Sequence, residues 1–215
     1  MKQLLFIIFC CLLMAGTLSM QSCSSNAIPT RVKYDVVADT ETIVMKGVLN
    51  RSLLEKEPSF TWMTENRKYG SADASAVKVF SEKKSLFTLL IFCGTWCHDS
   101  QNLLPIFFRL ADKSGFPEDR IQLVGVDRNK TAPKNWHQQW KIVNVPTFIV
   151  LRDGQEVGRV VEYGNTGNIE KELADIVAKL YLKIRLTHSS TALPAGCWHP
   201  PTECRAAARL RVAGK

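Results

Sequence analysis

The sequence predicts an α/β protein in which a central mixed β-sheet is flanked by helices. Two short runs are almost wholly apolar: SLFTLLIFC at residues 85–93 and IQLVGVD at residues 121–127. Such runs are typical of strands buried on both faces in the middle of a sheet. Two β-rich runs at residues 145–163 surround an Asp-Gly pair, which is the turn signal of a hairpin.

The segments ahead of the first central strand predict a smaller N-terminal β/α elaboration over residues 41–71. TIVMKGVL, at residues 42–49, has the composition of a strand. Residues 51–70 are helix-like, with a break near Pro58, because proline disrupts a helix interior.

The main domain is expected over residues 72–184 and opens with a helix, ADASAVKVFSEKK. Gly70 ends the segment before it, since glycine adopts the left-handed conformation that closes helices. Ser71 or Asp73 can cap the new helix through a side-chain oxygen.

Three further helices are expected around the central strands. Residues 99–115 form a helix with Pro105 inside it, and residues 132–140 form a short one. The last, at residues 165–184, is amphipathic. Its apolar face is made by Ile169, Leu173, Ile176 and Leu180.

The start of the chain has the pattern of a secretory signal, expected over residues 1–22. Lys2 precedes LLFIIFCCLLMA at residues 4–15, an unbroken apolar run. The run is shorter than the roughly 20 residues that a transmembrane helix needs. A basic start followed by a short apolar stretch is typical of a signal peptide.

The signal ends in MQSC, which resembles the bacterial lipoprotein cleavage box with Cys23 as the lipidated first residue. The alternative is ordinary secretion with Cys23 unmodified. An acyl anchor ties a soluble domain to a lipid bilayer without threading it through. We therefore expect a periplasm-facing, lipid-anchored protein of the bacterial cell envelope, with residues 23–40 as a tether.

The end of the chain, residues 185–215, reads as a disordered basic tail because it is rich in Ala, Pro and Arg and has no apolar period. From residue 183 onward there are six basic residues and one acid, so this end carries +5 of the chain's net +8. The domain itself is only mildly basic, and no nucleic-acid partner is expected.

The tail also contains CWHPPTEC, which holds Cys197, His199 and Cys204. A Cys-x6-Cys pair is not a standard zinc spacing. We expect no metal and no cofactor.

The chemistry is expected in FCGTWCHDSQNLLP at residues 92–105, where Cys97 follows a buried strand and opens a helix. Unpaired N–H groups and the helix dipole there favour a thiolate, which is the reactive form of cysteine. His98 adds a possible positive neighbour, whereas the Asp99 carboxylate works against the thiolate. The alternative is a small cysteine that only packs.

Four features in order resemble the thioredoxin fold, over about residues 72–180. W-C-x-x-S at residues 96–100 is similar to the active-site motif W-C-x-x-C, with Ser100 in place of the second cysteine. The other three are the helix proline Pro105, the loop Val145-Pro146-Thr147 and the hairpin glycine Gly154. In detail, GTWCHDSQNLLP, GVDR and VPTFIVLRDG resemble envelope thioredoxin-like proteins of Bacteroidetes-type bacteria.

The resemblance implies that Pro146 is cis and that Val145 offers its N–H and C=O to a partner in extended form. The partner's disulfide would then lie across Cys97, with Trp96 and Thr147 as supporting residues. The alternative is a trans proline at the start of an edge strand.

The chain departs from the family pattern at two positions. Ser100 cannot resolve a mixed disulfide, so an external reducing thiol must do so. Ile91 stands where the family often has a buried acid that serves the second cysteine. Cys93 is expected to pack beneath the site, because an extended strand would separate it from Cys97 by up to ~13 Å, too far for a disulfide.

Three functions therefore remain open. The first is a thiol-disulfide oxidoreductase that acts on protein thiols or disulfides through the single nucleophile Cys97, as a monothiol reductase or isomerase. The second is a module that binds or senses thiol clients without turnover. The third is a structural envelope lipoprotein.

Overall fold

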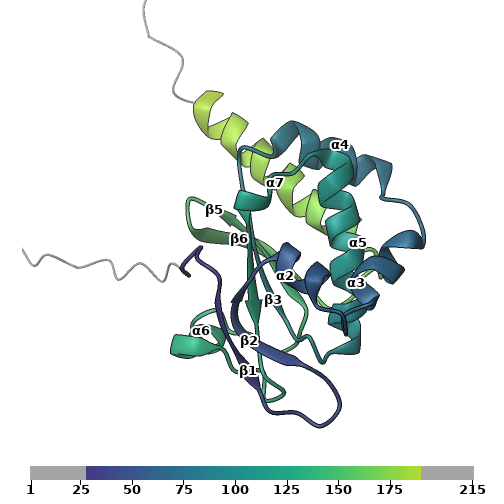
Figure 1. The fold of residues 1–215 in the computed structure, drawn as a ribbon. Coiled ribbons are helices and arrows are strands. Elements are labelled where there is room, and N and C mark those ends of the chain that lie inside the picture. Colours follow the sequence, from purple (N-terminus) through teal and green to yellow (C-terminus); the bar gives the residue numbers. More distant parts are fainter. Residues whose placement is uncertain (1–27, 190–215) are drawn as a thin grey trace, which may run out of the picture.

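A computed structural model describes residues 28–189 of the chain (Figure 1). Its sheet has six strands in the order β1-β2-β4-β3-β5-β6. Only the β3–β4 pair is parallel, so the sheet is mixed as predicted. The strands are β1 (Lys33–Val37), β2 (Val44–Leu49), β3 (Thr88–Cys93), β4 (Ile121–Gly125), β5 (Thr147–Arg152) and β6 (Gln155–Val161).

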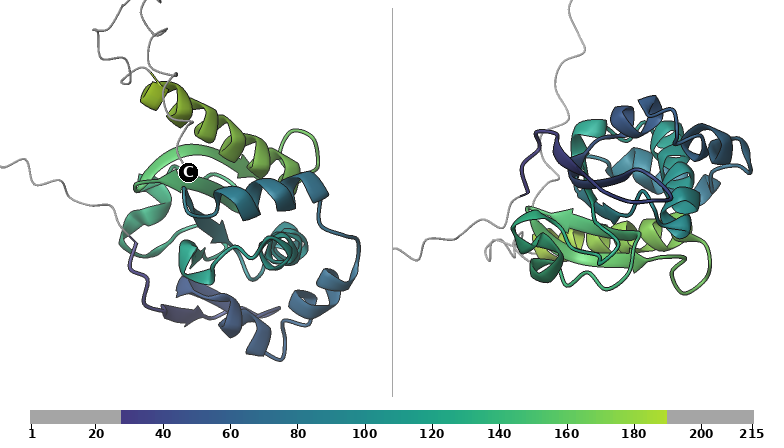
Figure 2. Two further views of the ribbon diagram at one scale, coloured as in Figure 1. Left: turned by 90° about the horizontal axis from the view of Figure 1, so that it is seen from above. Right: turned by 60° about the horizontal axis from the view of Figure 1, so that its bottom comes forward.

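Most of the helices cover one face of this sheet, and α6 covers the other (Figure 1). Seen along α5, the N-terminal helices and α4 lie on opposite sides of it (Figure 2, left). The α-helices are α2 (Arg51–Lys56), α3 (Trp62–Glu65), α4 (Ala74–Lys83), α5 (His98–Ser114), α6 (Trp136–Gln139) and α7 (Ile169–Ser189). Short 3-10 turns occur at Asn66–Lys68, Glu118–Arg120 and Pro133–Asn135.

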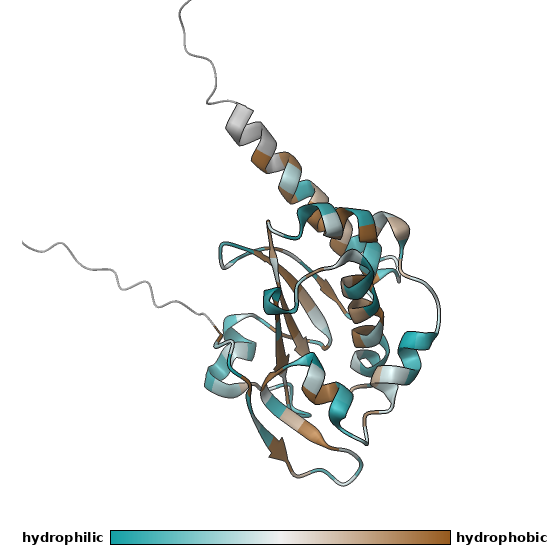
Figure 3. Ribbon diagram, turned by 45° about the horizontal axis from the view of Figure 1, so that its top comes forward, coloured by the Kyte–Doolittle hydropathy of each residue, from teal (hydrophilic) through white to brown (hydrophobic). Residues whose placement is uncertain are grey.

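The two apolar runs are central strands because both of their faces are buried, as predicted. Side chains alternate along β3: Leu89 and Ile91 enter the core under α4, α5 and α7, while Leu90 and Phe92 enter the core on the α6 side. Apolar strands accordingly occupy the interior of the hydropathy view (Figure 3).

The predicted helix boundaries follow from local capping. The Asp73 side chain caps α4 by accepting a hydrogen bond from the Ala76 N–H at 2.9 Å. Asn50 caps α2 in the same way, through the Leu53 N–H. Gly115 ends α5 in the left-handed conformation, with φ +62°.

Two expectations at the ends of the domain were wrong. Residues 33–37 lie inside the segment expected as a tether, yet they form β1 and pair antiparallel with β2. The helix α7 continues to Ser189, past the point at residue 185 where a disordered tail was expected to begin. The signal segment, Cys23 and the metal-binding candidates of the tail lie outside the described residues.

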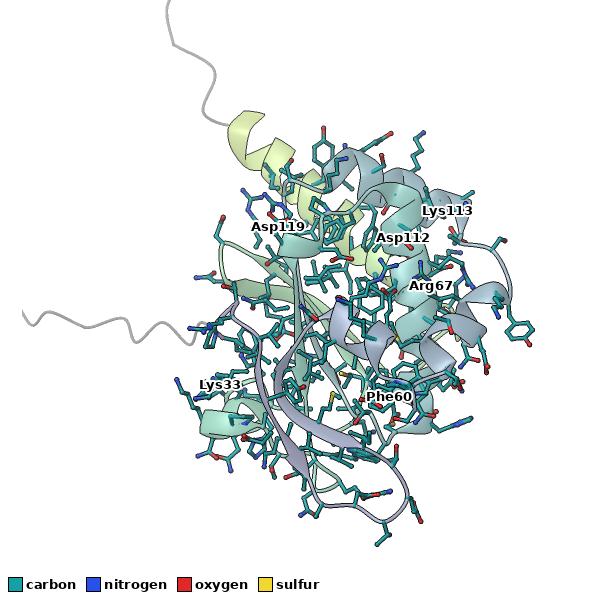
Figure 4. All side chains as sticks on the ribbon, in the orientation of Figure 1. Lys33, Phe60, Arg67, Asp112, Lys113 and Asp119 are labelled. Carbon is teal, nitrogen blue, oxygen red and sulfur yellow. The ribbon has the colours of Figure 1, made fainter. Side chains whose placement is uncertain are left out.

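The N-terminal elaboration is bound to the main domain by ion pairs. Arg51, the first residue of α2, contacts Asp112 of α5 at 2.6 Å and lies over the Phe108 ring. Arg67 also pairs with Asp112, and both side chains are labelled in Figure 4. The elaboration therefore packs on α5, the helix that begins at the active-site motif.

Within residues 28–189, the helices are all too short or too polar to cross a membrane.

Candidate functional site

The site is built where β3 ends and α5 begins. Cys97 is the N-cap residue of α5, in an extended backbone conformation, with φ −87° and ψ 122°. Its N–H donates to the Gly94 carbonyl at 3.0 Å, which closes a tight turn. Cys97 as a residue is partly exposed to solvent.

The loop before β5 lies directly against this thiol. Cys97 Sγ donates a hydrogen bond to the Val145 carbonyl at 3.1 Å, across a sequence separation of 48 residues. The Val145–Pro146 peptide bond is cis, as predicted. Thr147 begins β5, and its buried hydroxyl donates to the Asn144 carbonyl at 2.6 Å. The two motif segments thus form one site.

Trp96 shields one side of the turn. Its indole N–H donates to the Val126 carbonyl at 3.0 Å. A Cβ atom at Gly94 would lie 2.8 Å from the indole ring, so the ring rests on a position that requires glycine. The guanidinium of Arg128 lies 5.7 Å from the ring centroid, at cation–π distance.

Ser100 is fully buried, with 0% of its surface exposed. Its hydroxyl accepts a hydrogen bond from the Gly94 N–H at 3.1 Å and so satisfies a buried backbone donor of the turn. His98 is exposed and Asp99 is half-buried, both in the first turn of α5.

Cys93 differs sharply from Cys97. It is 0% exposed and belongs to the core under α5, where burial raises the pKa of its thiol far above the ordinary range. Both cysteines of the described segment are free. The prediction that Cys93 packs beneath the site is confirmed, as is the burial of the apolar Ile91 in the same core.

Sequence reasoning missed the polar frame around this turn. The buried hydroxyl of Thr95 bonds to the backbone of Met45 in β2 and of Ile43 just before it. The Gln101 side chain donates to the Thr95 carbonyl at 2.9 Å. Asp39 and Glu41, from the loop between β1 and β2, hold Arg128. No local motif predicts these hydrogen bonds, because the Thr95 hydroxyl and Arg128 each bond to residues far away in the sequence.

One further acid lies at this end of the sheet. Lys46 Nζ contacts Asp127 at 2.7 Å. Burial alone would raise the pKa of Asp127, but the hydrogen bonds from Lys46 and Thr131 lower it overall. Asp127 is thus a fixed, paired carboxylate. Among the described residues, the His, Cys, Asp and Glu side chains form no cluster of three suited to a metal ion.

A family model described as thioredoxin matches residues 73–175 of the chain. The thioredoxin of Mycobacterium bovis is 30% identical over 122 residues, which cover 55% of this chain and 99% of that protein. The chain belongs to the thioredoxin family. Its fold is thioredoxin-like, and family membership supports a thiol-disulfide oxidoreductase-like function on protein thiols.

Other relatives share parts of this thioredoxin domain. The TPR repeat-containing thioredoxin TDX of Arabidopsis thaliana is 29% identical over 106 residues, which cover 49% of this chain and only 26% of that protein. Among solved structures, the reduced Schistosoma mansoni thioredoxin pre-protein is 26% identical, with a TM-score of 0.32, and the match covers 51% of this chain and 93% of that one.

Proposed function

We propose that this thioredoxin-family protein exchanges disulfides with protein clients through one nucleophile, Cys97, and depends on an external thiol for release. The observation that carries the proposal is the position of Cys97. Cys97 is a partly exposed residue at the start of α5, and its sulfur contacts the Val145 carbonyl, next to the cis Pro146. A client in extended form can lie along that loop and present its sulfur to Cys97.

The exchange balances as follows. The Cys97 thiolate attacks one sulfur of the client disulfide, forms a mixed disulfide and releases the other client sulfur as a thiolate. An external thiol then attacks Cys97 and frees the client as its dithiol. A second external thiol regenerates Cys97, so two external thiols are oxidised to one disulfide. In isomerisation, a client thiolate attacks its own bound sulfur instead and no external thiol is consumed.

The Val145 carbonyl can change its hydrogen-bond donor in the course of this exchange. In the resting protein it accepts a hydrogen bond from the Cys97 thiol at 3.1 Å. Once Cys97 is a thiolate or part of a mixed disulfide, its sulfur has no hydrogen to donate. The carbonyl then becomes free to accept from a client backbone N–H at the stage when the client is bound.

Ser100 prevents internal resolution. Its hydroxyl cannot attack the mixed disulfide in place of a thiol, and it is already engaged by the Gly94 N–H. The second candidate function rests on this residue: without an external thiol, Cys97 would hold its client in a long-lived covalent complex and act as a thiol-binding or sensing module.

The deciding experiment measures reduction of a model protein disulfide in the presence of a small thiol. We expect Cys97→Ser to lose the activity and Cys93→Ala, the matched control, to keep it. Equal rates for the wild type and Cys97→Ser would rule out the enzymatic function. Covalent trapping of clients by the wild type without turnover would favour the binding module.

Ser100→Cys tests the missing resolving group. The added thiol lies one turn into α5 from Cys97. In a single turnover without an outside thiol, we expect it to attack the mixed disulfide, release the reduced client and form a disulfide with Cys97. A thiol is a weaker acceptor than a hydroxyl, so circular dichroism should first establish that the variant folds. A folded variant that releases no reduced client in this single turnover would contradict the role given to Ser100.

The location and the boundaries are also part of the proposal. A signal at residues 1–22 and lipidation of Cys23 would place the domain on the periplasmic side of a bacterial envelope, as the resemblance to Bacteroidetes-type proteins implies. Labelling cells with a fatty-acid analogue tests this: wild type should incorporate it and Cys23→Ala should not. Equal labelling of the two would contradict lipidation.

A further inference from the structure

The N-terminal hairpin β1–β2 reaches the nucleophile turn directly. The pairing of β2 with β4 ends at Gly47 opposite Gly125, but β2 runs on beyond this point. At this end of β2, the backbone groups of the chain form hydrogen bonds with a side chain instead of with β4. The Met45 N–H donates to the Thr95 hydroxyl at 3.1 Å, and that hydroxyl donates to the Ile43 carbonyl at 2.7 Å.

Thr95 is one of the buried polar residues of the domain, with 1% of its surface exposed. It lies two residues before Cys97, inside the turn that joins β3 to α5. Its carbonyl accepts from the side chain of Gln101, in the first turns of α5. Thr95 thus ties the turn to the hairpin on one side and to the helix on the other.

A second set of contacts joins the same hairpin to Trp96, the other residue of the turn that precedes Cys97. Asp39, in the loop between β1 and β2, accepts two hydrogen bonds from Arg128, at 2.5 and 3.0 Å. Arg128 in turn lies over the ring of Trp96. The hairpin therefore braces both residues that precede Cys97.

We propose that the N-terminal hairpin is a positioning element of the Cys97 site, with Thr95 as its positioning residue. This inference rests on the proposed function, because it takes the Cys97 thiol as the nucleophile that is positioned. Held in this way, the turn keeps Cys97 Sγ against the Val145 carbonyl, where a client disulfide must arrive. The hairpin lies before residues 73–175, the segment that matches the family model.

The physical reason is the cost of unpaired buried groups. Replacing the hydroxyl by a methyl of equal size leaves the Met45 N–H and the Ile43 carbonyl without their partner. The turn can then separate from β2 at little further cost. Opening should be local, because the strand ladder between β2 and β4 does not involve Thr95.

The test compares three variants of the full chain by hydrogen exchange and by reaction with a disulfide-bonded peptide. Thr95→Val removes both bonds, and Thr95→Ser retains the hydroxyl. Ser114→Ala is the matched control, since it removes a buried hydroxyl at the far end of α5 that bonds only within its own helix. Urea unfolding of all three corrects for global stability.

In Thr95→Val we expect exchange in residues 94–100 to rise about tenfold or more, given the cost of an unpaired buried group. Mixed-disulfide formation at Cys97 should fall, and Thr95→Ser should restore both. Unchanged exchange in residues 94–100, or an equal rise in Ser114→Ala, would overturn the inference. If exchange responds but even the wild type does not react with the peptide, the proposed function fails while the hairpin's hold on the turn stands.

Discussion

Two thiols only four residues apart have opposite properties because one lies in the core and the other at a helix start. Cys93 is fully buried, and burial raises the pKa of its thiol, whereas Cys97 is half-buried at the N-terminus of α5. A thiol that is both inaccessible and protonated does not react. The chemistry of the site therefore belongs to Cys97 alone among the cysteines of the described segment.

We predict that iodoacetamide modifies Cys97 and spares Cys93 in the folded protein. Peptide mapping by mass spectrometry should find the label on Cys97, and unfolding in urea should make Cys93 react as well. Cys97→Ser should leave residues 88–97 unlabelled under native conditions. Native labelling of Cys93 at a rate similar to Cys97 would contradict its assignment to the core.

A buried acid away from the site gives a pH-dependent stability. Glu170, at the start of α7, is 5% exposed; burial raises the pKa of its carboxyl, although the Asp73 N–H and the charge of Arg109 oppose the rise. Within the described residues, its Oε1 atom has no hydrogen-bond partner. A raised pKa means that the folded state binds the proton more tightly, so stability is lost as pH rises through the folded-state pKa.

We therefore predict that Glu170→Gln gains stability relative to the wild type as pH rises above the ordinary Glu value of 4.5, and that the gain levels off above the raised pKa. Glutamine keeps an acceptor for the Asp73 N–H but carries no charge. Urea unfolding at several pH values measures the difference. A gain that is constant across pH would show that the charge of Glu170 is not the cause.

Glu172, two residues further along the same helix, is the control. Burial tends to raise the pKa of its carboxyl, but hydrogen bonds from Thr166 and Asn165 lower it overall. The ionised form is thus the stabilising one, and its contribution is lost as pH falls. Glu172→Gln should lose stability relative to the wild type at neutral pH, opposite in sign to Glu170→Gln.

At the residue scale, the sequence was sufficient to place the site residues that belong to local motifs. Cys97, Val145 and the cis Pro146 could be placed because each lies within a short pattern with a known structural meaning. The bonds of Thr95 could not, because Ile43 and Met45 are about 50 residues away and face it only through the register of β2 on β4. Sequence alone does not specify that register.

At the scale of elements, buried strands could be predicted from the sequence and an exposed edge strand could not. The central strands were recognised because both faces are apolar, and the hairpin of β5 and β6 because Asp153 and Gly154 form its turn with positive φ angles. Strand β1 was missed because it is an edge strand whose side chains are mostly exposed, so KYDVV has no apolar alternation. Strand β1 is recognised only from its antiparallel pairing with β2 in the structure.

The close approach of β2 to β4 depends on glycine. A Cβ atom at Gly125 would collide with the Met45 carbonyl of β2 and lie 2.8 Å from the Leu49 side chain. Backbone cannot yield as a flexible side chain can, so the two strands would have to separate. We predict that Gly125→Ala lowers the free energy of unfolding by about 1–3 kcal/mol or more, as overpacking in a core does.

Urea denaturation measures this loss, with Gly154→Asn as the control. Gly154 has open space around it and a φ of +76°, which asparagine tolerates better than other residues. We expect its stability to change by about 0.5 kcal/mol or less, as for most surface substitutions. Equal stability of Gly125→Ala and the wild type would mean that the strands can move apart without cost.

At the scale of the whole molecule, the match to the family and the folded unit do not coincide. The family model matches residues 73–175, but the sheet also contains β1 and β2, which lie before that segment. Strand β2 contributes four buried apolar side chains, and three of them, Met45, Val48 and Leu49, pack into the two cores. The fourth is Val44.

We predict that a variant beginning at residue 50 is severely destabilised, whereas a control beginning at residue 28 is not. At about 1.5–3 kcal/mol for each buried apolar side chain, the four lost from β2 amount to roughly the whole stability of a typical domain. Removing them also bares the edge of β4, which invites aggregation. Urea unfolding and size-exclusion chromatography separate the outcomes. A monomer from residue 50 that unfolds cooperatively, within about 1 kcal/mol of the control, would show that the domain folds without β1 and β2. The hairpin would then be an accessory, and its hold on Cys97 would have to be tested apart from folding.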